Sequence, residues 1–214
     1  MLEGVELDTK LKEAFEKYSV KEEDRSTLLD YLNLLMTKHP ITRIHGEHSK
    51  RVGLKAGEIA EFTDLDKKAL LYAGLTHDLG KCQVPLSTLG KTSGWTEKDS
   101  EAIKTHVLDG YRMLVGRFDF TADTMVLHHT FQINGYPGEI PPPLHPYSEE
   151  TQLLIVEHGR ILALADVYDA LHRENDKFVE KRALNDAEIR EQMFILNPDR
   201  EKLVEDLYKV GIFI

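Results

Sequence analysis

Five histidines and two aspartates in this sequence have the types and spacings that suit a metal site. Four of them form two adjacent pairs, His77-Asp78 in the run HDLGK at residues 77–81 and His128-His129. In chain order the set is His48, His77, Asp78, His106, His128, His129 and Asp166. Imidazole suits iron, zinc, copper and nickel, and carboxylate suits harder ions such as manganese. A mixed set without thiolates therefore favours iron or manganese over a structural zinc, and it makes the chain a candidate hydrolase.

The number of these side chains fits two ions. Neighbouring residues point about 100° apart on a helix, but at a helix end His77 and Asp78 can flank one point. The two oxygens of Asp78 allow it to bridge two ions. Two octahedral ions offer about twelve positions, of which five imidazoles, one terminal carboxylate and one bridging carboxylate fill about eight. The rest are open to water, hydroxide and substrate, whereas a closed structural site has no open position.

Such a pair of ions has a defined chemistry. Two divalent ions about 3.5–4 Å apart hold a bridging hydroxide and clamp a phosphate oxygen, which favours in-line hydrolysis of a phosphoester without a protein nucleophile. Lys81, about one turn beyond the pair, can meet a substrate phosphate as a point charge. Asp169, three residues after Asp166, is expected either to orient a ligand histidine or to be an ordinary acid on the helix surface.

Each member of the set has an ordinary explanation when it is taken alone. A single histidine such as His48 or His106 is more often a surface or hydrogen-bonded core residue than a ligand. Lys81 would be a solvated lysine, and Asp166 would form an ion pair. Only the joint pattern in this order favours ligation. The remaining histidines fit no such scheme: His39, His45, His145, His158 and His172.

Helical periodicity accounts for most of the chain. Apolar residues recur at helical spacing in two segments within residues 1–39, and Pro40 ends the second. Further helices are expected over about 47–62, 66–75, 96–114, 121–129 and 149–172, with two more after Asp186 and Pro198. Thr96 and Asp99 resemble a capping box. No period-two run of β-branched residues interrupts this pattern, so we predict an all-α fold.

The expected helices put the candidate ligands in favourable places. His77-Asp78 falls at the end of the helix over 66–75, and Asp166 lies inside the long helix, where a lone carboxylate facing the core is unfavourable without a cation. The core stripe of that helix is expected to be Leu154, Ile161, Leu164, Ala165 and Tyr168. Residues 80–95 are predicted to be a loop. The Pro/Gly-rich stretch 131–148 is a second loop, and loops of this length are usually functional or disordered.

Length and composition narrow the classes of protein. The 214 residues fit an N-terminal helical extension at 1–39, for packing or homodimerisation, and a catalytic domain at 40–214. The net charge is −10 and no block of Lys and Arg is present, which argues against a protein that binds a nucleic acid polymer. No apolar run is long enough to span a membrane and no signal peptide is recognisable. Since Cys82 is the single cysteine, no internal disulfide can form, and we expect a cytoplasmic protein.

Five motifs in one order carry a resemblance to a known family. They are His48-Ser49-Lys50-Arg51-Val52, HDLGK at 77–81, Lys104-Thr105-His106, HHTFQINGYP at 128–137 and ADVYDAL at 165–171. Together they resemble the HD-domain metal-dependent phosphohydrolases, and within them the HD-GYP subfamily. The resemblance implies an HD-domain helical bundle with two or three metals, often iron or manganese, and hydrolysis of cyclic di-GMP to pGpG or GMP.

The resemblance also implies roles for individual residues. The seven residues of the set become metal ligands, with Asp78 catalytic and bridging, and Lys81 contacts phosphate. Gly135-Tyr136-Pro137 shapes the loop beside the site, where Tyr136 either touches the substrate or buttresses the loop. Three-metal members carry a glutamate four residues before the first histidine. Ile44 stands there in this chain, so we expect two ions, with Glu47 as an acid that could compensate.

Other positions depart from the family and concern the substrate. Thr130 stands where the family usually has Glu, and the segment up to Gly135 is one residue shorter, with Ile133-Asn134 in place of an acidic Asp-Gly. The family's phosphate-binding run after ADVYDAL is poorly matched here by Arg173, Asn175 and Lys177. The 39 residues upstream are too few for a receiver or other sensory domain, so we expect none.

The resulting hypothesis is a metal-dependent phosphodiesterase that hydrolyses a cyclic dinucleotide, cyclic di-GMP first, through a hydroxide bridging two ions, with Lys81 neutralising the developing charge. One alternative is an HD-type phosphohydrolase for another phosphoester, such as a nucleotide monophosphate or a 2′,3′-cyclic nucleotide. Thr130 and the shortened loop favour it. A second alternative is a weakly active nucleotide-binding signalling module, and a third is a protein with a structural metal, which chelation would unfold.

Overall fold

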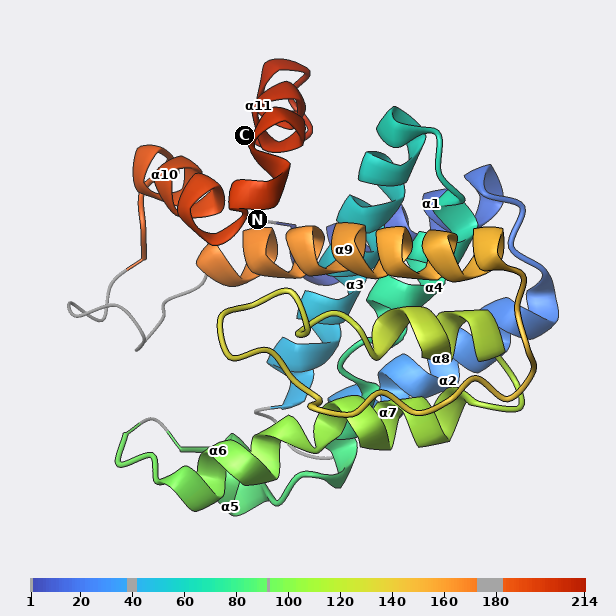
Figure 1. Ribbon diagram of the computed structural model, residues 1–214, viewed down its shortest axis with the longest axis vertical. Coiled ribbons are helices and arrows are strands. Elements are labelled where there is room, and N and C mark those ends of the chain that lie inside the picture. Colours follow the sequence, from blue (N-terminus) through green and yellow to red (C-terminus); the bar gives the residue numbers. More distant parts are fainter. Residues whose placement is uncertain (1, 38–41, 92, 173–182) are drawn as a thin grey trace.

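The computed structural model describes residues 2–37, 42–91, 93–172 and 183–214, and within them it contains helices and no strand. The prediction of an all-α fold is confirmed (Figure 1). The elements are α1 (Gly4–Lys17), α2 (Glu22–Thr37), α3 (Thr42–Thr63), α4 (Lys67–Thr76), the 3₁₀ turn η1 (Leu79–Gln83), α5 (Leu86–Leu89), α6 (Glu97–Lys104), α7 (His106–Leu114), α8 (Asp119–Met125), α9 (Glu149–Leu171), α10 (Asp186–Leu196), the 3₁₀ turn η2 (Pro198–Arg200) and α11 (Glu201–Lys209).

Helices α3, α4 and α9 form the centre of the bundle. In Figure 1, α9 runs across the molecule, with α10 and α11 on one side of it and α7 and α8 on the other. Side-chain oxygens of Asp66 and Ser148 cap the first turns of α4 and α9, where free backbone N–H groups need an acceptor. Helices α3 and α4 approach each other very closely at two glycines. A Cβ on Gly74 would lie only 2.5 Å from the Cα of Gly53, so glycine is needed there. This contact fixes the end of α4 beside the first half of α3.

The N-terminal helices α1 and α2 pack on α3 and α4. Their apolar faces form a second buried cluster with α4, which includes Leu11, Phe15, Leu28, Leu32 and Leu71. Burial of one such side chain stabilises the folded state by roughly 1.5–3 kcal/mol relative to leaving that side chain exposed. The extension is therefore a packing element, and homodimerisation through it stays a prediction. The division of the chain near residues 39 and 40 falls outside the described residues.

Several expected boundaries were wrong. Helix α3 begins at Thr42, and the helix predicted over 96–114 is two helices, α6 and α7, which meet at Thr105. The capping box of Thr96 and Asp99 is confirmed. Segment 80–95 contains η1 and α5, and α8 ends at Met125, so that residues 126–132 form turns. The glycines and the proline within 80–95 keep the helical runs of that segment short without removing them.

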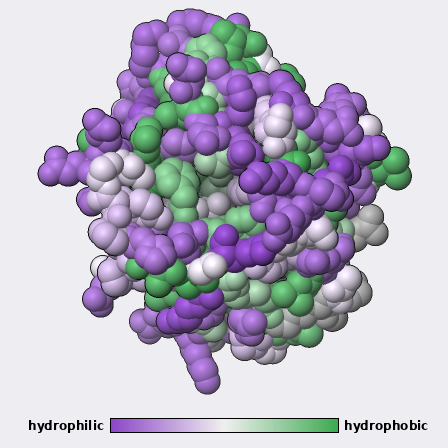
Figure 2. Space-filling model, turned by 90° about the vertical axis from the view of Figure 1, so that its right-hand side faces the viewer, coloured by the Kyte–Doolittle hydropathy of each residue, from purple (hydrophilic) through white to green (hydrophobic). Residues whose placement is uncertain are grey.

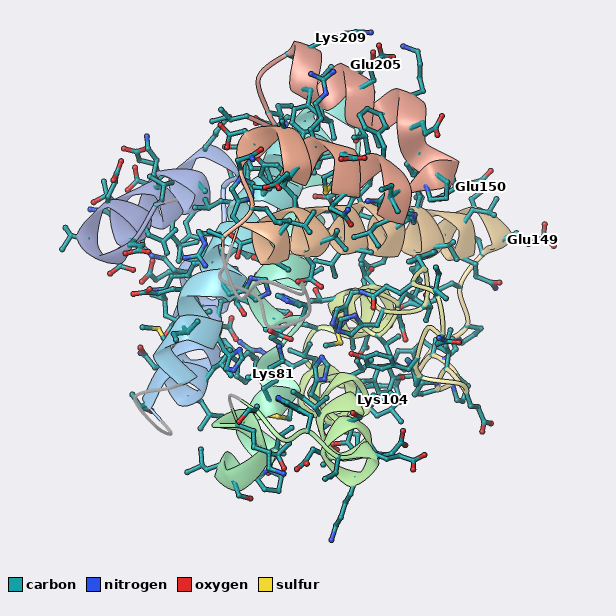
Figure 3. All side chains as sticks on the ribbon, turned by 90° about the vertical axis from the view of Figure 1, so that its left-hand side faces the viewer. Lys81, Lys104, Glu149, Glu150, Glu205 and Lys209 are labelled. Atoms are coloured by element: carbon teal, nitrogen blue, oxygen red, sulfur yellow. The ribbon has the colours of Figure 1, made fainter. Side chains whose placement is uncertain are left out.

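The core stripe predicted for α9 was wrong at one end. Leu154 is 45% exposed, whereas Ile155 is buried together with His158. The first turns of α9 extend past the centre of the bundle, and Glu149 and Glu150 lie at its outer end (Figure 3). The ring of Phe120 on α8 contacts His158, so packing between helices, which the periodicity does not reveal, covers this side of α9. The other four predicted core positions are buried: Ile161, Leu164, Ala165 and Tyr168.

The surface matches the mixed charge of the sequence. On the face shown in Figure 2, hydrophilic residues dominate and hydrophobic ones are scattered between them. Among the described helices, none combines the length and the apolar character that crossing a membrane requires.

Candidate metal centre

All seven candidate ligands meet at one place inside the bundle, although they come from different elements. His48 lies on α3, His77 ends α4, and Asp78 precedes η1. His106 begins α7, Asp166 lies on α9, and the pair at 128–129 lies in the turns after α8. The Nε2 atoms of His48 and His77 are 3.3 Å apart, and Nε2 of His48 is 3.0 Å from Oδ1 of Asp166. The sequence set is thus one spatial cluster.

The cluster divides into three overlapping groups that could each hold an ion. In every group the ligand atoms lie within 4.8 Å of one another. The groups are His48, His77 and Asp78; His77, His128 and Asp166; and His106, His128 and His129. Since His77 and His128 each belong to two groups, the groups are adjacent. Neither Ile44, which is 54% exposed, nor Glu47 belongs to any of them.

Asp78 belongs to the first group, also faces His106 of another group, and is almost fully buried. Its Oδ2 is 3.6 Å from Nε2 of His77, and its Oδ1 is 3.4 Å from Nε2 of His106. The two oxygens therefore face different groups, as a bridging ligand requires. A Cβ on Gly80 would lie 1.9 Å from the backbone oxygen of His106, so glycine at this position allows η1 to rest directly on the start of α7.

Three of the histidines are oriented by the backbone. Their Nδ1 atoms lie 2.5–2.8 Å from the carbonyl oxygen three residues earlier, in the pairs His77–Gly74, His106–Ile103 and His128–Met125. A carbonyl oxygen can only accept, so in each ring Nδ1 carries the proton and Nε2 keeps its lone pair. The Nε2 atoms of His106 and His128 are buried without a hydrogen-bond partner among the described residues. This donor set fits a divalent ion, which would satisfy both lone pairs.

His48 is oriented by a carboxylate instead. Its Nδ1 is 2.6 Å from Oδ2 of Asp169, and Nε of Arg51 donates to Oδ1 of Asp169 at 2.6 Å. The side chains of Arg51 and Asp169 are both largely buried. Asp169 is therefore not an acid on the helix surface. It orients the ring of His48, as one of the two interpretations of the sequence predicted. Sequence reasoning gave Arg51 no role, although its position three residues after His48 on one helix was a usable signal.

Charge around the cluster keeps the carboxylates ionised. Burial alone would raise the pKa of Asp78, but Lys81 and His77 hold it well below its usual range. Burial would likewise raise the pKa of Asp166, and its contacts with His48 and His77 lower it. Lys81 is not a solvated lysine, because its Nζ lies 2.6 Å from Oδ2 of Asp78. It lies below α9 in the middle of the molecule in Figure 3, with Lys104 on α6 nearby in that view.

The loop after α8 closes over His129. The ring of Tyr136 stacks on that of His129 with centroids 4.5 Å apart and an interplanar angle of 29°. Gly135 makes this closure possible, since a Cβ there would lie 2.5 Å from the backbone oxygen of Thr130. Tyr136 thus buttresses a candidate ligand, and its contact with substrate stays a prediction. Sequence reasoning missed Gln132, whose side-chain nitrogen is 2.9 Å from Nδ1 of His129.

We expect the metal-free protein to lose stability as the pH falls below about 6.5. Burial lowers the pKa of His106 from 6.5 to about 3 and that of His129 to about 4. The unfolded chain therefore takes up protons below pH 6.5 that the folded protein does not, and stability falls in that direction. Each such histidine contributes up to about 1.4 kcal/mol per pH unit.

His77 does not reverse this trend. Burial would lower its pKa, but Asp78 and Asp166 raise it above 6.5, so well below 6.5 it is protonated in both states and adds no slope. Urea unfolding of chelator-treated protein measures the effect: the midpoint should fall steadily between about pH 6.5 and about pH 5. A midpoint that stays constant or rises over this range would contradict the prediction.

Comparison with known proteins gives a consistent result. A family model described as HD domain matches residues 46–171, a range that includes all seven candidate ligands. A protein of Thermotoga maritima named cyclic di-GMP phosphodiesterase is 28% identical over 168 residues, which are 75% of this chain and 42% of that protein. A protein of Xanthomonas campestris named cyclic di-GMP phosphodiesterase response regulator is 27% identical over 157 residues, 71% of this chain and 39% of that protein.

A third relative, a protein of Pseudomonas aeruginosa also named cyclic di-GMP phosphodiesterase, is 34% identical over 103 residues, 46% of this chain and 22% of that protein. The chain therefore spans less than half of the length of each of these curated relatives.

Proposed function

This chain belongs to the HD-domain family, and from that premise we propose that it is a metal-dependent phosphodiesterase of the HD-GYP type that hydrolyses a cyclic dinucleotide, cyclic di-GMP first. One observation carries the proposal: five imidazoles and two carboxylates converge with their ligand atoms in three adjacent groups. The printed names of the relatives support the choice of substrate. Residues 40–214, which include the matched range, form the proposed catalytic domain.

Two divalent ions, iron or manganese, are the proposed cofactors. His48, His77 and Asp166 would hold one, and His106, His128 and His129 would hold the other, with Asp78 shared between them. Bound ions would polarise a phosphate oxygen and make water a stronger nucleophile. The donor set of imidazole and carboxylate without thiolate supports these metals. The Nδ1 atoms of His77, His106 and His128, which donate to backbone carbonyl oxygens, would keep the Nε2 atoms of these rings ready as donors before any ion arrives.

Lys81 is the proposed phosphate contact. Its ammonium group is held against Asp78 at 2.6 Å, next to where a phosphate between the two groups would lie. An ammonium group in this place would attract a phosphate oxygen and offset the negative charge that develops there. Asp78 would keep Lys81 charged and in position, while the stack of Tyr136 on His129 would shield one side of the site from water.

Thr130 supports a second candidate function. Its hydroxyl donates to the backbone oxygen of Leu127 at 2.7 Å, so it turns back onto the preceding turn and supplies no carboxylate. Three residues further on, Ile133 in the shortened loop is 91% exposed. These differences favour an HD-type phosphohydrolase for another nucleotide or phosphoester, or a nucleotide-binding module with little turnover.

Product analysis separates these functions. The full chain is loaded without oxygen with Fe(II) or Mn(II) and mixed in turn with cyclic di-GMP, a nucleotide monophosphate and a 2′,3′-cyclic nucleotide, and the products are separated by chromatography. We expect metal-dependent formation of pGpG or GMP from cyclic di-GMP. Turnover of another phosphoester alone would replace the substrate assignment. Tight binding of cyclic di-GMP without product would favour the binding module.

A further inference from the structure

His129 differs from the other four candidate ligands in the partner of its Nδ1. The other Nδ1 atoms face a backbone carbonyl oxygen or the carboxylate of Asp169, which can only accept a hydrogen bond. Nδ1 of His129 faces the side-chain amide of Gln132 at 2.9 Å. An amide has both an acceptor oxygen and a donor nitrogen. His129 is therefore the one candidate ligand whose tautomer depends on how its partner is turned.

The orientation of this amide determines which nitrogen of the neutral His129 ring carries the proton. With the amide nitrogen at Nδ1, Gln132 donates, and a neutral ring then carries its proton on Nε2, where the proton blocks ligation. With the amide oxygen at Nδ1, the ring proton lies on Nδ1, and the lone pair of Nε2 is free. A half-turn of the Gln132 amide exchanges the two arrangements, because its oxygen and nitrogen are nearly equal in size.

The local structure keeps the ring in place during such an exchange. Tyr136 stacks on one face of His129, and the backbone N–H of Gln132 donates to the backbone oxygen of His129 at 3.4 Å. The Gln132 side chain is exposed, so its amide can turn without moving the core. Thr130 cannot replace it, since its hydroxyl is used on Leu127.

We infer that Gln132 is a positioning residue that sets the tautomer of His129, and so controls how tightly the group of His106, His128 and His129 holds its ion. The inference rests on the proposed function, which makes these histidines ligands. According to this inference, the group that contains His48 and His77 binds its ion tightly. The affinity of the group of His106, His128 and His129 depends on Gln132. The departure of this chain from its family after the histidine pair thus bears on the metal site itself.

Two substitutions at this position should act in opposite directions. In Gln132→Glu the carboxylate can only accept, which holds the proton on Nδ1 and makes Nε2 a better donor. In Gln132→Lys the ammonium group can only donate, which holds the proton on Nε2. Partners of metal-bound histidines typically change affinity by about 10–100-fold. The matched controls are Ile133→Glu and Ile133→Lys, which introduce the same charges at the neighbouring, 91% exposed position.

The experiment measures how tightly the chelator-treated full chain binds Zn²⁺. The affinity is determined by titration calorimetry in competition with a chelator. We expect two binding steps in the unsubstituted protein. Gln132→Glu should strengthen the weaker step and Gln132→Lys should weaken it about ten-fold or more relative to its Ile133 control, while the tighter step stays the same. Long-range ¹H–¹⁵N spectra of the metal-free proteins should show the His129 proton on Nδ1 in the first variant and on Nε2 in the second.

Two other outcomes would be decisive. If both Gln132 variants match their Ile133 controls in the weaker step while His129→Ala weakens it, the inference fails and the metal site stands. If the unsubstituted protein binds no Zn²⁺, or His129→Ala leaves both steps unchanged, the proposed two-ion function fails with it.

Discussion

Asparagine in place of Asp78 is expected to leave the protein folded and to reduce its metal-dependent hydrolysis about a thousand-fold or more. The two oxygens of Asp78 face different groups of histidines, with His77 on one side and His106 on the other. Asparagine keeps the volume but loses the charge and replaces one oxygen by an NH₂ group, which cannot ligate. The change therefore removes several kcal/mol of transition-state stabilisation, because the asparagine side chain keeps only one oxygen for the two groups that both oxygens of Asp78 face.

The measurement is the initial rate of pGpG or GMP release by Asp78→Asn and by the unsubstituted chain at equal metal loading. Asp109→Asn on α7 is the matched control, because its carboxylate pairs with Arg112 on the surface and it should keep the normal rate. Circular dichroism and a melting curve establish that both variants fold. Turnover by Asp78→Asn within ten-fold of the unsubstituted rate would overturn the role of Asp78.

Alanine in place of Asp169 is expected to weaken both the fold and the metal site. Asp169 joins His48 to Arg51 through bonds of 2.6 Å on each side, and its contacts with both residues lower its pKa to about 2 although burial would raise it. Its removal leaves Arg51 buried without its carboxylate, which typically destabilises a protein by about 3–5 kcal/mol. The ring of His48 also loses its orienting partner, for which we expect about a 10–100-fold loss of metal affinity.

Asp199→Ala separates these two effects. Asp199 makes a similar two-point contact with the buried Arg160, at 2.9 and 2.7 Å, on α9 and η2. This control should lower the urea midpoint of the metal-free protein and leave Zn²⁺ affinity unchanged, whereas Asp169→Ala should lower both. If Asp169→Ala binds Zn²⁺ as tightly as Asp199→Ala does, then Asp169 only stabilises the fold and does not position His48.

The sequence was sufficient to predict most of the helices and to single out seven side chains that meet in one cluster, and their role as metal ligands stays a prediction. Helices form from local hydrogen bonds and are limited by local signals, as Asp66, Thr96 and Ser148 show by capping α4, α6 and α9. The histidines and aspartates were recognisable because their types and order are those that metal chemistry requires. Boundaries that depend on packing were predicted less well. The break at Thr105 lies where η1 rests on α7, and the buried side of α9 begins at Ile155 instead of Leu154.

Only the tertiary structure decided which atoms meet. The contact of Gly53 with Gly74 places His48 beside His77, and Asp169 reaches His48 from 121 residues away. No local pattern encodes such pairs, because side chains on separate helices become neighbours only through the packing of whole helices. The tautomer of His48 follows from such a pair, because its Nδ1 donates to Asp169, whereas those of His77, His106 and His128 follow from local carbonyl oxygens three residues earlier. The sequence by itself thus determined the helices and named the candidate ligands, and packing between helices determined that these side chains meet in one cluster.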